Sequence, residues 1–201
     1  MSDRLFFPLA ALLALGLVAL GLQPALGALP SGSVSGGGTD YSEVILEGAD
    51  LNRIIGGGES DIDLIARGED DYVLRIETGI DNMDQLVEEG PHFRLAADLE
   101  NVFQGRTLEV TVRARPADEA GARAFVVNYY AGQVGESGWQ RFLLTPDFED
   151  HTFALEVPLR IGPQGVDFLG VRPSTLDKPR AILIERVTLR PLTPMVDSGQ
   201  S

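Results

Sequence analysis

Short runs of alternating apolar and polar residues dominate the chain from Tyr41 onward. The clearest run is TLEVTVRAR, residues 107–115, in which Val110 and Val112 alternate with polar side chains. Residues 151–158, HTFALEVP, repeat the pattern. Successive side chains of a β-strand point to opposite faces of the sheet, so each run predicts a strand with one buried face.

Further runs of the same kind are separated by Pro, Gly, Asp and Asn. They cover residues 42–48, 61–67, 71–78, 91–97, 123–130, 139–145, 166–172 and 180–189. About ten strands without intervening helices predict an all-β protein, an antiparallel sandwich or barrel. The one expected helical turn is NMDQLVEEG, residues 82–90, which we place at one end of the fold.

The N-terminal stretch differs from the rest because it is apolar from Leu5 to Leu22. A helix of that length spans about 27 Å, close to the thickness of a bilayer core. Gln23 and Pro24 then end the helical pattern, and the small residues up to Gly27 fit a signal-peptidase site. Residues 1–27 are therefore a cleaved signal peptide or a transmembrane anchor. Both alternatives predict export to the periplasmic side of the inner membrane, anchored there or released into the periplasm.

Composition divides the remainder of the chain. Residues 28–40, ALPSGSVSGGGTD, have the composition of a flexible Gly/Ser linker. Residues 41–192 form the predicted β-sandwich domain, and residues 193–201 a disordered tail.

Charge and cysteine content exclude several classes of function. The formal net charge is −14, and residues 59–89 hold eleven carboxylates but only two arginines. Such a chain repels phosphate backbones and anionic lipid surfaces, so we expect no nucleic-acid partner and membrane contact through the N-terminal segment alone. There is no cysteine, which excludes disulfides, thiolate metal sites and cysteine nucleophiles.

From about Ile45 to Leu192 the chain resembles the galactose-binding-like jelly-roll β-sandwiches, which include many carbohydrate-binding modules. The resemblance is an ordered series of strand and turn patterns. It is carried by residues 90–116, 138–158, 167–173 and 181–189. It implies a jelly-roll fold that binds a sugar or another partner and has no catalysis of its own.

Sequence motifs for catalysis are missing. GESGW, residues 135–139, has Trp139 where a nucleophile elbow needs glycine. The Asp61 and Asp63 pair opens like a calcium loop, but Ile65 occupies the third ligand position. We therefore expect a non-catalytic carbohydrate- or polysaccharide-binding module. The alternatives are a structural or protein-interaction domain of an envelope assembly and, third, a glycan-active hydrolase that uses two carboxylates.

The stretch YYAGQVGESGWQRF, residues 129–142, contains the candidate ligand site. Period two places the chain's single tryptophan, Trp139, on the same strand face as Arg141. Asn128 and Tyr130 share a face of the preceding strand. If the two strands pair, the four side chains converge on an exposed patch suited to a sugar, with a ring for its C–H face and polar groups for its hydroxyls. The alternative is that Trp139 fills the core.

Glu185 is the one carboxylate in an otherwise apolar face of a predicted strand, residues 180–189. A buried carboxylate needs a partner, so we expect an arginine, a β-bulge that turns the residue outward, or a metal. The resemblance implies that a structural calcium ion is possible here, with ligands around Glu47 and Asp50. No other cofactor is expected.

Overall fold

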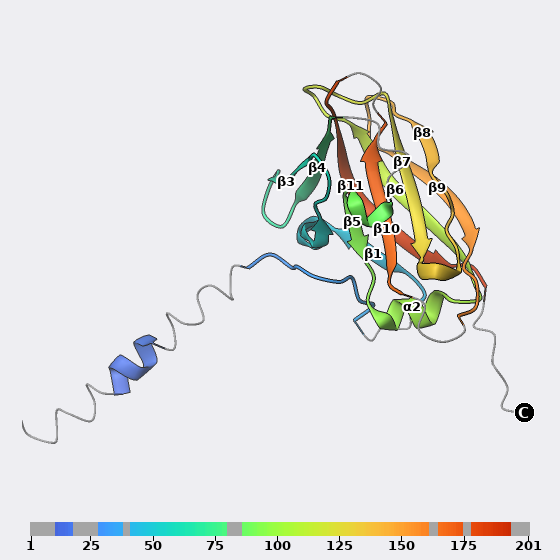
Figure 1. The fold of residues 1–201 in the computed structure, drawn as a ribbon. Coiled ribbons are helices and arrows are strands. Elements are labelled where there is room, and N and C mark those ends of the chain that lie inside the picture. The colour runs from blue at the N-terminus through green and yellow to red at the C-terminus, as the bar shows by residue number, and fades with distance from the viewer. Residues whose placement is uncertain are drawn as a thin grey trace, which may run out of the picture.

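The chain folds into two antiparallel β-sheets packed face to face (Figure 1). The structure is a computed structural model that describes residues 11–17, 28–37, 41–79, 86–160, 165–174 and 178–193. One core cluster takes side chains from both sheets. The predicted all-β class is therefore confirmed, and the two antiparallel sheets agree with the predicted sandwich.

The larger sheet has six strands in the order β3-β4-β11-β6-β9, with β1 paired to β11 beside β4. Its strands are β1 (Val44–Glu47), β3 (Ser60–Ala66), β4 (Tyr72–Thr78), β6 (Thr107–Pro116), β9 (Glu149–Glu156) and β11 (Arg180–Pro191). The smaller sheet has five strands in the order β2-β5-β10-β7-β8. They are β2 (Ile54–Ile55), β5 (His92–Arg94), β7 (Ala124–Ala131), β8 (Gln140–Leu143) and β10 (Asp167–Pro173).

Alternation in the sequence sets which side chains enter the core. Val110 and Val112 of β6 are fully buried between the sheets, and Phe153 and Leu155 of β9 pack against them from the edge. In β7 the odd-numbered residues enter the same core, whereas Asn128 and Tyr130 point to the other side of the sheet. The sequence pattern predicted this register correctly.

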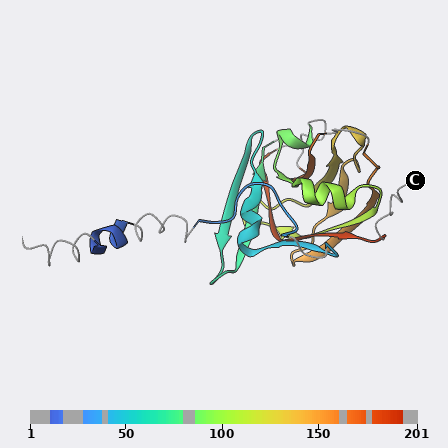
Figure 2. The ribbon, with the colours of Figure 1, turned by 90° about the horizontal axis from the view of Figure 1, so that it is seen from below.

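Short helices accompany the strands among the described residues. They are η1 (Gly48–Arg53), η2 (Val87–Glu89), η3 (Gly132–Val134) and α2 (Ala97–Phe103). α2 lies across one end of the sandwich (Figure 2) and seals it with Leu99 and Phe103, both fully buried. The sequence pattern missed α2 because its two apolar side chains are too few to show a helical period. The turn expected at residues 82–90 is η2 over its last part, and residues 82–85 lie outside the described residues.

Most of the predicted signal peptide or anchor, residues 1–27, also lies outside the described residues. Residues 11–17 are helical. Among the residues that the structure describes, no helix has both the length and the apolar character needed to cross a bilayer.

The Gly/Ser stretch contacts the sandwich over residues 28–37. The Val34 amide donates to the Arg94 carbonyl at 2.7 Å, and the Val34 carbonyl accepts from the Ala96 amide at 2.8 Å. The Val34 side chain is 1% exposed, and the Asp98 carboxylate accepts from Ser35 Oγ at 2.7 Å. The described fold therefore begins before Tyr41, and the flexibility of this segment stays a prediction. Of the predicted tail only Thr193 is described, and its carbonyl accepts from Arg106 Nε at 2.6 Å.

Candidate functional site

The outer surface of the five-stranded sheet is built from the side chains that alternate with the core residues. We call this surface the outer face. Because β7, β10 and β5 pair in register, its side chains form rows across the sheet. Tyr130 lies opposite Phe168, which lies opposite Arg94. In the next row Asn128 lies opposite Gly170, which lies opposite His92.

Trp139 lies on the outer face, immediately before β8. A Cβ added to Gly170 would meet Trp139 Cη2 at 3.1 Å and Cζ3 at 3.6 Å, so the indole occupies the space left by the missing side chain. The ring is half-buried and does not belong to the core cluster of the described residues. The sequence left open whether Trp139 lies on the outer face or fills the core. In the structure it lies on the outer face.

Arg172 supports the indole ring from beneath. Its guanidinium carbon lies 4.0 Å from the centroid of the Trp139 ring, a distance at which the ring quadrupole attracts the cation. Nη2 donates to the Leu86 carbonyl at 3.3 Å, and a Cβ on Gly90 would lie 2.9 Å from the guanidinium carbon. Arg172 is 2% exposed. The guanidinium is thus held between the ring and the η2 segment, which fixes where the ring stands.

Asn128 is buried below the predicted patch, with 1% of its surface exposed. Its Nδ2 donates to Glu136 Oε2 at 2.7 Å, and its Oδ1 accepts from Ser137 Oγ at 3.2 Å. Both halves of the amide therefore hold the loop that leads into Trp139. A direct contact between Asn128 and a ligand stays a prediction.

Tyr130 and Phe168 extend the aromatic surface beyond Trp139. Their rings stack with centroids 6.1 Å apart and planes 16° apart, and both residues are half-buried. The His92 ring meets the edge of Phe168 at 5.1 Å, with its Nδ1 2.8 Å from the Gly90 carbonyl. The sequence pattern missed the part that Phe168 and His92 play. Their alternation with Leu169 and Phe93 predicts that Phe168 and His92 point away from the core. The sequence pattern does not predict that β10 pairs with β7, which brings Phe168 beside Tyr130.

Arg141 follows Trp139 along the edge strand β8. Its partner in the register is Val126, whose other neighbour is Arg172. Arg141 is exposed, and within the described part of the chain it makes no hydrogen bond or ion pair. The structure therefore brings Tyr130, Trp139 and Arg141 to one face as predicted, with Asn128 underneath.

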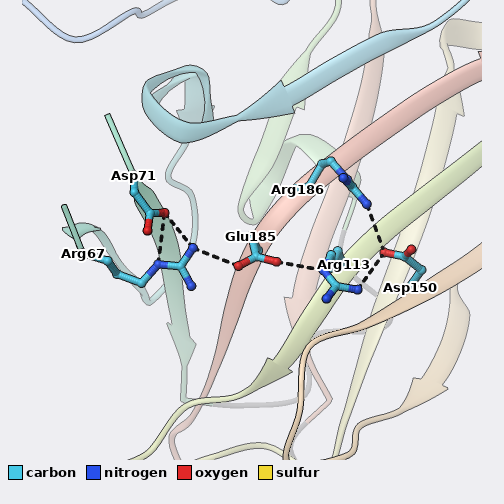
Figure 3. A network of polar contacts seen from close by, with 6 residues as sticks. All are labelled: Arg67, Asp71, Arg113, Asp150, Glu185 and Arg186. Atoms are coloured by element: carbon cyan, nitrogen blue, oxygen red, sulfur yellow. Dashed lines mark hydrogen bonds and ion pairs between the residues drawn. The ribbon is translucent and has the colours of Figure 1, made fainter. Parts of the chain in front are cut away.

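A second polar cluster lies on the opposite side of the sandwich, on the outer surface of the six-stranded sheet (Figure 3). Its centre is Glu185, where the pairing of β11 with β6 shifts register in a bulge between Ile184 and Arg186. Glu185 Oε1 accepts from Arg67 Nη2 and Oε2 accepts from Arg113 Nε, both at 2.8 Å. Burial opposes ionisation here, but these two hydrogen bonds hold the pKa of Glu185 below its usual value. The expected arginine partner and the expected bulge are both present.

These residues do not fit the calcium ion that the resemblance allowed. Each oxygen of Glu185 already accepts a hydrogen bond from a guanidinium, and the Asp50 carboxylate accepts from Arg53 Nε at 2.9 Å. Arg67 itself lines the hollow of about 530 Å³ beside Glu47 and Glu185. No group of three metal-binding side chains occurs among the described residues. Two guanidinium groups neutralise Glu185 instead.

Two further carboxylates, the buried Asp167 and the half-buried Glu100, lie at or near α2. Asp167 is fully buried and accepts from Tyr129 Oη at 2.7 Å, and Arg160 pairs with both Asp167 and Glu100. Burial raises the pKa of Glu100, although Arg160 and Arg94 oppose the shift. Burial also raises the pKa of Tyr129. Arg160 and Tyr129 thus contact these carboxylates, so the groups of this cluster are partners of one another.

Similarity to known proteins is limited to the fold. No protein-family model matches the chain, and no curated protein matches it. Among solved structures, the CBM22-2 xylan-binding domain of Xyn10C from Paenibacillus barcinonensis superposes with a TM-score of 0.51 at 8% identity, over 74% of this chain and 98% of that domain. The arabinose-bound α-L-arabinofuranosidase MgGH51 gives 0.50 at 10% identity, over 82% of this chain but 29% of the enzyme. The sandwich is thus a fold that carbohydrate-binding modules use.

Proposed function

We propose that the protein is a non-catalytic carbohydrate-binding module that binds a glycan or polysaccharide at the outer face. The observation that carries the proposal is the gathering of Tyr130, Trp139 and Phe168 on one side of a single sheet, beside the exposed Arg141. Aromatic rings bind the C–H face of a sugar, and a guanidinium donates to its oxygens. Fold similarity to carbohydrate-binding modules supports the proposal by analogy.

The rigidity of the site also supports binding. Arg172 holds Trp139 from below, and Asn128 holds the loop that precedes it. A platform fixed before the ligand arrives loses little conformational entropy on binding. For the cellular setting, we propose that the module acts on the outer side of the inner membrane, exported through its apolar segment, residues 5–22.

Binding of purified protein to a panel of envelope and plant polysaccharides tests this function, with affinity electrophoresis as the readout. We expect Tyr130→Ala and Trp139→Ala to weaken binding by about tenfold or more, as truncation of central aromatic contacts does. Phe148→Ala is the matched control, because Phe148 is a half-buried aromatic residue on the outer surface of the other sheet, beside Arg67 and Arg115.

Melting curves recorded on the same samples separate binding from folding. A variant that melts above the assay temperature and still binds less reports on the site. If the wild type binds no polysaccharide in the panel, or if folded Tyr130→Ala and Trp139→Ala bind as the wild type does, the outer face is not a glycan site.

A further inference from the structure

The charge on the outer face differs from that of the whole chain. The formal net charge is −14, yet this face presents the guanidinium groups of Arg94 and Arg141, both exposed. Within the described residues neither guanidinium forms a hydrogen bond or an ion pair, although Arg94 acts electrostatically on the half-buried Glu100 and opposes the rise in its pKa that burial causes. Most other arginines are used differently: Arg67, Arg113 and Arg190, for example, are each paired with a carboxylate on the opposite sheet.

Two of the carboxylates near the outer face accept hydrogen bonds from the protein. Glu136 Oε2 accepts from Asn128 Nδ2 at 2.7 Å, and Glu89 Oε2 accepts from the Leu86 amide at 3.2 Å. Glu88 is exposed on η2, at the border of the face. Behind Trp139, the buried guanidinium of Arg172 adds a third positive charge. Among the described residues, the solvent-exposed guanidinium groups on this face are those of Arg94 and Arg141.

The register places these two guanidinium groups at opposite corners of the aromatic surface. Arg141 is on the row of Arg172, and Arg94 is on the row of Phe168, which comes four residues before Arg172 in β10. At about 3.3 Å per residue and about 4.8 Å per strand, their Cα atoms lie roughly 19 Å apart. Tyr130, Trp139 and Phe168 lie between the two corners.

We infer that the ligand of the outer face is an anionic polysaccharide whose sugar rings bear carboxylates. This inference rests on the proposed glycan-binding function and adds the class of glycan. The rings of Tyr130, Trp139 and Phe168 contact sugar faces, while Arg94 and Arg141 each take a carboxylate in the planar, two-bond geometry that guanidinium groups favour. Two cation positions separated by more than one sugar select a polymer with repeated acidic units.

The test compares each acidic polymer with a neutral polymer of the same backbone. The probes are polygalacturonate, alginate and glucuronoxylan, each beside its carboxyl-reduced form, titrated against the full chain at two salt concentrations. We expect at least one acidic form to bind roughly tenfold more tightly than its reduced form. We also expect that advantage to shrink as salt rises.

Variants that remove the charge of Arg94 or Arg141 test whether these two residues cause the preference for acidic polymers. Arg141→Gln and Arg94→Gln should each lower the affinity for the acidic form by more than the affinity for the reduced form, and so remove most of the preference. Arg190→Gln, which removes one charge from the opposite sheet, should alter neither.

The outcomes separate this inference from the proposed function. Equal binding of the acidic and reduced forms, or an acidic preference that survives both substitutions, overturns the anionic class and leaves glycan binding intact. If no acidic or reduced polymer binds, the anionic class and the glycan-binding function both fail for these probes.

Discussion

The guanidinium carbon of Arg172 lies 4.0 Å from the centroid of the Trp139 ring, and Arg172 is 2% exposed. One residue therefore positions the tryptophan and fixes η2 through the Leu86 carbonyl. A shorter, strongly hydrated lysine cannot reproduce the stacked plane. We expect Arg172→Lys to lower the free energy of unfolding by about 2 kcal/mol and to shift the emission of Trp139. Urea titration followed by tryptophan fluorescence measures both, and a variant identical to the wild type in both contradicts the positioning role.

Gly170 leaves the space that the indole occupies. A Cβ there would lie 2.8 Å from Val87 Cγ1 and 3.1 Å from Trp139 Cη2. We expect Gly170→Ala to displace one of these groups, lowering stability by about 1–3 kcal/mol and weakening ligand binding. Gly56→Ala is the matched control, because its Cβ would meet Ile62 Cδ1 at an ordinary 3.5 Å. Equal melting temperatures for Gly170→Ala and Gly56→Ala would show that the position of Trp139 does not require a glycine at residue 170.

Removal of metal ions should leave the fold unchanged. Arg67 and Arg113 occupy both oxygens of Glu185, so we expect the melting temperature in excess chelator to match that in calcium within error. Glu185→Gln should cost about 1 kcal/mol or less, since the network is partly exposed. A drop of several degrees on chelation, reversed by calcium, would mean that an ion and not the arginine pair holds this bulge.

His151 makes stability depend on pH. Burial against the rings of Phe125 and Phe142 lowers the pKa of His151, although Glu149 and Asp150 oppose the shift. The unfolded chain takes up a proton near the usual value of 6.5, while the folded chain stays neutral to a lower pH. The stabilisation is therefore complete above that value and is lost as the pH falls from 6.5 toward the lowered folded pKa.

Urea unfolding at a series of pH values measures this loss. His151→Gln removes the titrating group and should flatten the curve below pH 6.5. An unchanged pH profile in this variant would assign the dependence to other groups.

Local alternation predicted most of the strands because period two is a direct consequence of strand geometry. The alternation correctly predicted which side chains of β6 and β9 face the core. It also predicted that Tyr130, Trp139 and Arg141 point away from the core. It did not give β2, which has two residues, or α2, whose burial depends on tertiary packing.

Features that depend on which strands are neighbours were beyond the sequence pattern. Phe168 and Arg172 join the candidate site only because β10 pairs with β7. Glu185 accepts a hydrogen bond from Arg67, which is 118 residues away in the sequence. The alternation of residues within one strand does not predict such a contact. Residues 28–37 have the composition of a free linker, but Val34 enters the core through its pairing with Leu95.

The most direct measurement of the central claim is a titration of the wild-type chain with polysaccharide, followed by tryptophan emission. Trp139 is the only tryptophan, so the signal reports the outer face and nothing else. We predict a saturable shift in emission whose midpoint equals the dissociation constant found by calorimetry. Saturable binding in the calorimeter with no change in emission would contradict a glycan site at Trp139.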